Sequence, residues 1–381
     1  MSDKLSSNIN KFGSGRACDK WLNSLNWQID FYRLSNKRKR VDSEFDWEWL
    51  DRISKKGVCG IAKSMISETL RWFSIKNAGS LQEWLNANAD LLWDARNLLE
   101  DDLSKLFFDN VLTLHCSDYH QFFFPRIYFE DFVSIVSENP FLSNELPQDY
   151  LGLPLREFIL DLHTQRNVPP VTVISTKLQI NLLNKYRQYF MQRNMINFNP
   201  SAGDVVFDCG ACIGDISMLF AGLVGESGEV HLFDPVPLHT RYCQLQSSMN
   251  PLLSKIFRIN AKAVGDITRD FMGEKNDSDE IRPGGLSVDS FAMTTLDDYA
   301  EVKDIKRVNL IKMDIEGAEM SALKGASKII RKFKPMLAIS AYHKPEDLWQ
   351  IPIKIKELNV KYKIFFGHHS PLQWESVYYA L

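Results

Sequence analysis

The chain has 381 residues, a formal net charge of −3, 45% hydrophobic residues and 24% charged residues. This length favours two domains, the composition is typical of a globular protein, and the weak net charge argues against nucleic acid or anionic lipid as a partner. Because no run of 18 apolar residues and no signal-like N-terminal stretch occurs, we expect no membrane span. Six scattered cysteines favour reduced thiols and a cytoplasmic location.

The first part of the chain has the pattern of helices. Apolar residues spaced by three and four form a stripe from Leu81 to Leu99, and the pattern repeats from Leu103 to Val111. The basic run 37–40 is interpreted as a solvated loop. Because the double proline at 169–170 cannot continue a helix, we predict a helical N-terminal domain over residues 1–165.

The second part, residues 166–381, is predicted to be an α/β domain. From about residue 204, short β-branched runs alternate with helical stretches, which indicates a parallel sheet with helices on both faces. A buried strand ends at Asp208, Gly210 and Gly214 follow, and a helix begins after Asp215. This order of strand, glycine turn and helix is typical of the first unit of a doubly wound nucleotide-binding fold.

Carboxylates accompany this glycine turn. The next strand ends at Asp234, where a carboxylate is placed to accept ribose hydroxyls, and Ala263 and Val264 end a predicted third strand that would line an adenine pocket. The glycines follow G-x-x-x-G and are flanked by Asp208 and Asp215, which would repel a pyrophosphate. The ammonium and sulfonium charges of S-adenosylmethionine suit these carboxylates, so we predict that methyl donor. The spacing of Cys209 and Cys212 is interpreted as incidental, because no second metal half-site accompanies it.

A second charged cluster follows a later strand. The strand from Val308 to Met313 is predicted to place Lys312, Asp314 and Glu316 on one side at its carboxyl end. The following strand ends just before His343, which falls at the same sheet edge, where open α/β sheets bind their ligands. We also expect His368, which closes the penultimate strand, to face the site.

Together these segments resemble the FkbM family of S-adenosylmethionine-dependent methyltransferases. The resemblance extends over about 195–381 and is carried by DVVFDCGACIGD (204–215), HLFDPVP (231–237), AVGD (263–266), TTLDDY (294–299), IKMDIEGAE (311–319) and AISAYHKPEDLWQIP (338–352). It implies a class I methyltransferase (Rossmann-like) seven-stranded sheet with an antiparallel last strand. It also implies O-methylation, commonly of sugars in bacterial surface glycans or of natural-product hydroxyls.

The resemblance also implies roles for single residues. The methionine part of the donor would be held by Asp208, Gly210, Gly214 and Asp215, the ribose by Asp234, and the adenine by Ala263 and Val264. The acceptor, a sugar, nucleotide sugar or glycan, would face Lys312, Asp314, Glu316 and His343. The sequence departs from the family in having Asp234 where glutamate is common, and Gly367-His368-His369 where Arg-His-Tyr is common.

Several alternatives stay open at this point. We hypothesise that His343 or Asp314 takes the hydroxyl proton of the acceptor. A divalent metal held by Asp314 and Glu316 would serve the same purpose, although we predict no metal site. A nicotinamide-dependent oxidoreductase on a similar sheet, or a non-catalytic interaction protein, would be a different class of protein. The N-terminal part is expected to select the acceptor or to mediate homodimerisation.

Overall fold

The computed structural model describes residues 15–34, 81–116, 132–163, 169–193, 196–272, 290–370 and 374–381. The basic run 37–40, interpreted above as a solvated loop, lies outside these ranges. None of the helices within them is both long and apolar enough to span a bilayer.

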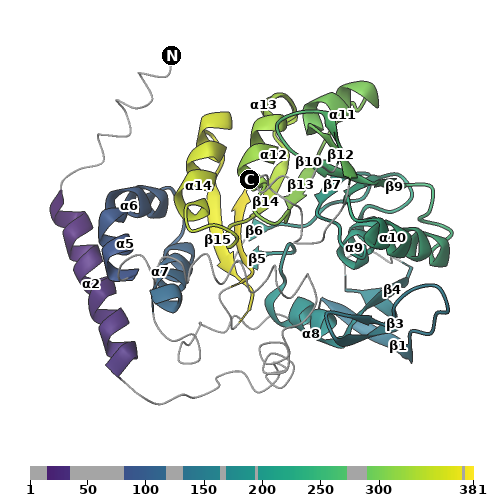
Figure 1. The fold of residues 1–381 in the computed structure, drawn as a ribbon, viewed down its shortest axis with the longest axis horizontal. Helices are drawn as coiled ribbons and strands as arrows, with labels where there is room; N and C mark the ends of the chain where they lie inside the picture. The colour runs from purple at the N-terminus through teal and green to yellow at the C-terminus, as the bar shows by residue number, and fades with distance from the viewer. Residues whose placement is uncertain are drawn as a thin grey trace.

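A seven-stranded sheet forms the centre of the fold (Figure 1), and this confirms the predicted α/β class. Its strands, in spatial order, are β15 (Ile364–His368), β16 (Ser376–Ala380), β14 (Met336–Ser340), β13 (Leu310–Met313), β7 (Val205–Cys209), β8 (Glu229–Phe233) and β9 (Phe257–Asn260). The last strand, β16, runs antiparallel to both of its neighbours, as the family resemblance implies. The carboxyl ends of β7, β8, β13 and β14 therefore meet at one edge.

Alternate residues of the strands enter two different cores. Phe207, Ile311 and Ile339 pack on one face, whereas Val206 and Leu310 pack on the other. The strands β7, β13, β15 and β16 are buried along their whole length, which explains their largely apolar sequences, whereas the edge strand β9 is partly exposed. The helices that follow the sheet strands are α9 (Asp215–Val224), α10 (Pro237–Met249), α11 (Leu296–Val302), α12 (Glu319–Gly325), α13 (Ser327–Phe333) and α14 (Asp347–Leu358).

The N-terminal helices belong to the first of these cores. They are α2 (Gly15–Leu34), α5 (Leu81–Ala87), α6 (Ala89–Asn97) and α7 (Asp102–Cys116). In Figure 1, α7 lies beside β15 and α6 lies beside α14, and the buried residues of the N-terminal helices share one apolar cluster with the sheet. Ser104 of α7 accepts a hydrogen bond from Arg193 at 3.0 Å and from the backbone of Phe366 in β15 at 2.9 Å. These helices therefore complete the core of the sheet.

The predicted boundary at residue 166 is wrong, and so is the helical prediction for the residues just before it. Residues 133–176 form a small antiparallel sheet of β1 (Val133–Pro140), β2 (Asp149–Tyr150), β3 (Leu153–Leu162) and β4 (Val171–Thr176). The boundary would separate β3 from its partner β4. The prolines 169–170 directly precede β4 and do not end a domain, since proline is tolerated at the start of a strand. This sheet packs against α9 and α10.

The predicted third strand is also divided differently. The strand β9 ends at Asn260, and residues Lys262–Val264 form β10 of a separate three-stranded sheet with β11 (Arg269–Met272) and β12 (Ser290–Thr294). Two short strands, β5 (Gln192–Arg193) and β6 (Ile196–Asn197), and the helix α8 (Lys177–Tyr186) connect β4 to β7.

Candidate functional site

The glycine turn after β7 requires both of its glycines. Gly210 and Gly214 have φ values of +79° and +87°, a region that favours glycine. A Cβ atom on Gly210 would lie 1.7 Å from the Asp314 carbonyl oxygen, and one on Gly214 would lie 2.9 Å from Cys243 Sγ. The turn is therefore packed directly against the segment that follows β13, and this contact joins the two predicted halves of the site.

Asp208 and Lys312 form a buried ion pair beneath this turn. The two residues are register partners on the neighbouring strands β7 and β13, so their side chains meet, with Lys312 Nζ 2.9 Å from Asp208 Oδ1. Lys312 Nζ also donates to the Gly210 carbonyl at 2.7 Å. Burial lowers the pKa of Lys312, but the charges of Asp208 and Asp314 outweigh this effect and raise it overall. Lys312 is therefore a fixed cation that holds the turn.

Asp215, at the start of α9, lies on the opposite side of the turn. Its Oδ2 accepts a hydrogen bond from Ser175 at the end of β4 at 2.6 Å, and its Oδ1 accepts one from the Ile216 backbone at 2.9 Å. Burial raises the pKa of Asp215, although these two donors oppose the effect. The small antiparallel sheet thus supplies a direct partner for a predicted donor-binding residue.

Asp234, at the end of β8, supports the backbone of the turn. It accepts hydrogen bonds at 2.9 Å from the backbone of Cys212 and of Val236, and His239 Nδ1 lies 3.0 Å away. Cys212 in turn has its Sγ 2.9 Å from the hydroxyl of Tyr150 in β2. Both carboxylate oxygens of Asp234 therefore support the backbone around the turn.

Asp314 is held between two tyrosines. Tyr189 donates to its Oδ2 at 2.7 Å, and Tyr342 donates to its Oδ1 at 2.8 Å. Burial raises the pKa of this carboxyl, but the nearby His343, Lys312 and the two hydroxyls outweigh burial and lower it overall. Burial raises the pKa of both tyrosines well above its usual range, so both keep their protons and donate. Asp314 is therefore a carboxylate at neutral pH.

His343 lies behind Asp314 and is 1% exposed. Its Nδ1 is 2.9 Å from Glu319 Oε1, and its Nε2 is 3.5 Å from Asp314 Oδ1 and 3.6 Å from Glu316 Oε2. One ligand atom each from Asp314, Glu319 and His343 would fall within 4.8 Å of the others, a spacing that could hold a metal ion. The Ile315 backbone and His343 contact Glu319 Oε1, and the two tyrosines donate to the Asp314 oxygens, so these groups also form a connected polar network.

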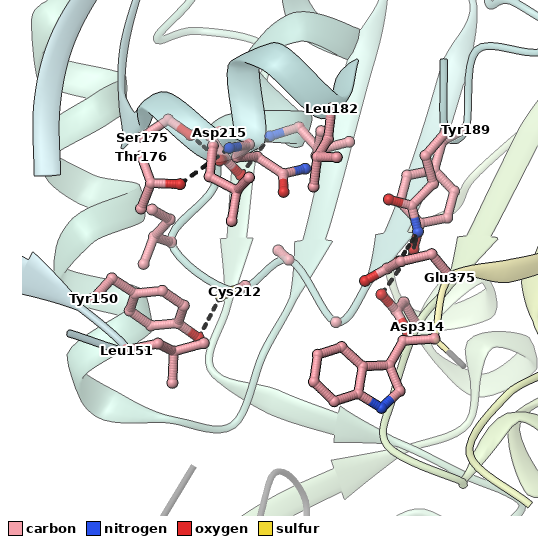
Figure 2. Close-up of a pocket in the computed structure, with 18 of the residues that line it drawn as sticks. Tyr150, Leu151, Ser175, Thr176, Leu182, Tyr189, Cys212, Asp215, Asp314 and Glu375 are labelled. Carbon is pink, nitrogen blue, oxygen red and sulfur yellow. Dashed lines mark hydrogen bonds between the residues drawn. The ribbon is translucent and has the colours of Figure 1, made fainter. Parts of the chain in front are cut away.

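A cavity of about 210 Å³ opens above these groups. Figure 2 shows Asp314, Glu375 and Tyr189 on one wall, with Asp215 and Ser175, and Tyr150 and Cys212, across from them. Four predicted site residues line it, namely Gly210, Asp215, Lys312 and Asp314. The predicted residues outside its lining are Asp208, Gly214, Asp234, Ala263, Val264, Glu316, His343 and His368.

Three of these residues lie in other parts of the fold. Ala263 and Val264 are buried in β10, outside the seven-stranded sheet. His368, expected to face the site, ends β15 with its Nδ1 2.9 Å from Ser376 Oγ. Burial lowers the pKa of its neighbour His369 to about 3, and that ring lies between the Tyr186 carbonyl and the Tyr379 hydroxyl.

The cavity contains residues that the sequence analysis did not identify. They come from β2 and its following turn, from the end of β4, from the segment after α8 and from the segment before β16: Tyr150, Leu151, Ser175, Gln188, Tyr189, Trp374 and Glu375. No motif marked them, because segments far apart in the chain meet only when the small sheet packs on α9. The sequence offered one weak indication, which is that Glu375 is a single charged residue beside the largely apolar C-terminal run SVYYAL.

Comparisons with known proteins agree with this architecture. Residues 208–368 match the family model of the methyltransferase FkbM domain. The crystal structure of methyltransferase FkbM from Methylobacillus flagellatus KT is similar at a TM-score of 0.51 and 20% identity, covering 80% of this chain and 62% of that one. This chain thus spans about three-fifths of that protein's length.

Two other solved structures are more distant. Aeropyrum pernix fibrillarin with bound S-adenosyl-L-methionine has a TM-score of 0.34 and 11% identity over 65% of this chain and 99% of that one. A SAM-dependent methyltransferase from Aquifex aeolicus has a TM-score of 0.29 and 15% identity, and the match covers 47% of this chain and 82% of that one. No curated protein sequence matches this chain.

The family match begins at Asp208 and ends at His368, so it spans every site residue that the motifs predicted. The observed sheet order and the antiparallel β16 agree with it. Residues 208–368 of this chain therefore match the methyltransferase FkbM domain, and the chain has the class I methyltransferase fold.

Proposed function

We propose that this protein is an S-adenosylmethionine-dependent O-methyltransferase that acts on a hydroxyl of a sugar or glycan. The observation that carries the proposal is the charge of the cavity. Three carboxyl groups line it, from Asp215, Asp314 and Glu375, against one cationic side chain, Lys312, which is already paired with Asp208 below the lining. Such a cavity suits a ligand with ammonium and sulfonium charges and disfavours a pyrophosphate.

The residues present fit the methyl donor. The turn 210–214 and Asp215 would hold the methionine part, and Asp234, at the end of β8, would hold the ribose. S-adenosylmethionine, when bound, supplies an electrophilic methyl group on a positively charged sulfur. The role of the chain is to orient an acceptor oxygen toward that methyl group, to exclude water and to remove one proton.

The sugar acceptor is supported by aromatic and polar side chains in the same cavity. Tyr150, Tyr189 and Trp374 line it together with Ser175 and Gln188. All five lie outside the residues 208–368 that match the family domain. We infer that these flanking segments, and not the methyltransferase domain alone, select the acceptor.

The test is a methyl-transfer assay. Purified protein is incubated with S-adenosylmethionine and a panel of nucleotide sugars, glycan fragments and phenolic natural products, and mass spectrometry detects the addition of one methyl group. Methylation of a sugar hydroxyl supports the proposal. Methylation confined to the phenolic compounds would replace the sugar acceptor with a natural-product acceptor. Parallel reactions with and without a chelator test for a metal, and we expect equal rates.

A further inference from the structure

Glu375 has the position and the contacts of a group that exchanges a proton with a ligand. It lies just before β16 and lines the cavity on the same wall as Asp314 (Figure 2). Gln188 Nε2 donates a hydrogen bond to its Oε2. Within the described ranges, no hydrogen-bond donor contacts its Oε1. One carboxyl oxygen is thus held in place, and the other is available to a ligand.

The backbone fixes this side chain in its position. Glu375 has a φ of +72°, which is unusual for a residue with a side chain. Leu151, Tyr189 and Cys212, which also line the cavity, have positive φ values as well. Such conformations persist where the surrounding structure determines them, and they concentrate at functional sites.

The two bases predicted from the sequence are less suited to this role. Both oxygens of Asp314 already accept tyrosine hydrogen bonds, and its pKa is lowered, which weakens it as a base. His343 does not line the cavity, and Asp314 lies within 3.5 Å of its Nε2. Glu375 is the lining carboxyl that has both an available oxygen and no fixed cation beside it in the described structure.

Resting on the proposed function, we propose that Glu375 is the catalytic base, whose available oxygen takes the proton of the acceptor hydroxyl. The acceptor oxygen gains the methyl group as its O–H bond breaks, and the proton passes to the Glu375 carboxylate. The electron pair of the broken methyl–sulfur bond stays on sulfur, which becomes a neutral thioether. Asp314 and its tyrosines then position the acceptor.

The electrostatic surroundings agree with this assignment. Burial and the charge of Asp314 raise the pKa of Glu375 to about 8, against the opposing effects of Gln188 and His343. The titratable groups that interact with it are Asp314, Glu316, Tyr189, Tyr342, Tyr379 and His343. A general base is most effective when its pKa is near the working pH. A positively charged ligand beside Glu375 would favour its carboxylate form and so prepare the base.

This coupling can be measured without knowing the acceptor. S-adenosylmethionine and S-adenosylhomocysteine share their titratable groups and differ in the methyl group and its positive charge. If the charge lowers the pKa of Glu375 by about one unit from 8, binding at pH 7.5 releases about 0.5 proton. We therefore titrate the protein with each compound by calorimetry, in two buffers of different ionisation enthalpy, and compare the protons released.

Three variants complete the design. We expect wild type and the control Glu357→Gln, on the exposed side of α14, to release about 0.5 proton more with S-adenosylmethionine than with S-adenosylhomocysteine. Glu375→Gln should bind both compounds and lose the difference. Gln188→Leu removes a hydrogen-bond donor that favours the charged form of Glu375. The difference in proton release between the two compounds should therefore appear at higher pH. This variant keeps the test valid if Glu375→Gln does not fold.

Turnover provides the second readout. With an acceptor from the panel, Glu375→Gln should lower kcat by about 10²–10⁴-fold and leave the affinity for S-adenosylmethionine within a few fold. Glu375→Gln with normal turnover, or with an unchanged difference in proton release, would overturn the assignment. If the difference in proton release appeared at the same pH in Gln188→Leu as in wild type, the assignment of Glu375 would be overturned as well. Wild type that binds neither compound would refute the proposed function itself, and the base with it.

Discussion

The contact between Gly210 and the Asp314 backbone gives a sharp test of how the site is assembled. In Gly210→Ala, the new Cβ atom would lie 1.7 Å from the Asp314 oxygen, so that oxygen would have to retreat to at least about 3.0 Å. Alanine at a φ of +79° costs about 1–2 kcal/mol, and forcing a packed backbone apart costs roughly another 1–3 kcal/mol. We expect a total destabilisation of about 2–5 kcal/mol and a loss of at least about tenfold in donor affinity.

Gly152→Ala is the matched control. Gly152 has a similar φ of +75°, but no atom of the described residues lies within 4 Å of its added Cβ, so only the conformational cost of about 1–2 kcal/mol should appear. Urea denaturation measures the free energy of unfolding of both variants, and titration with S-adenosylhomocysteine measures the affinity. If Gly210→Ala were no less stable than Gly152→Ala and bound the ligand as wild type does, the described packing of the turn would be refuted.

Three further predictions concern the core, the donor site and pH. A chain of residues 166–381 should show no cooperative unfolding by calorimetry, because it lacks the helices that pack on β15; a transition at the temperature of the full chain would contradict this. Asp234→Asn should weaken S-adenosylhomocysteine binding by about tenfold or more, since it disturbs the Cys212 backbone contact; an unchanged Kd would contradict the role. Because the folded pKa of Glu375, about 8, exceeds its ordinary value of 4.5, its stabilising effect is complete below about pH 4.5 and is lost as the pH rises through 8. Urea denaturation should therefore show wild type losing ~1–4 kcal/mol more than Glu375→Gln between pH 5 and 8.5, and parallel pH curves would contradict it.

The sequence allowed the central sheet to be predicted because its strands are buried on both faces. Runs such as Val205-Val206-Phe207 are continuous and apolar. Such a run is followed by a charged residue, here Asp208, at the carboxyl edge of the sheet. The third strand was misplaced because β9 and β10 are separated only by Ala261, and nothing in the residues distinguishes their two sheets.

The N-terminal part was harder to predict because its partners are distant in the chain. The stripe from Leu81 to Leu99 correctly indicated helices, but not that α6 packs on α14 and shares the core of the sheet. The strands β1 and β3 have mixed polar and apolar residues, because they form a small sheet with exposed positions, and the double proline obscured the start of β4.

The site divides in the same way. Gly210, Asp215, Lys312 and Asp314, which line the cavity, could be predicted because strand ends of a parallel sheet meet at one edge. Tyr189 and Glu375 could not, because their positions depend on the packing of segments 186 residues apart in the chain. Asp208, which the sequence predicted to hold the donor, forms an ion pair with Lys312 beneath the turn.

Binding of the methyl donor is the most direct test of the account. Equal concentrations of S-adenosylmethionine and NAD are titrated into the full chain by calorimetry, under identical buffer and salt conditions. We predict saturable binding of S-adenosylmethionine with one site per chain, and no measurable heat from NAD, whose pyrophosphate the carboxyl groups of the cavity repel. Binding of NAD, without binding of S-adenosylmethionine, would contradict the account.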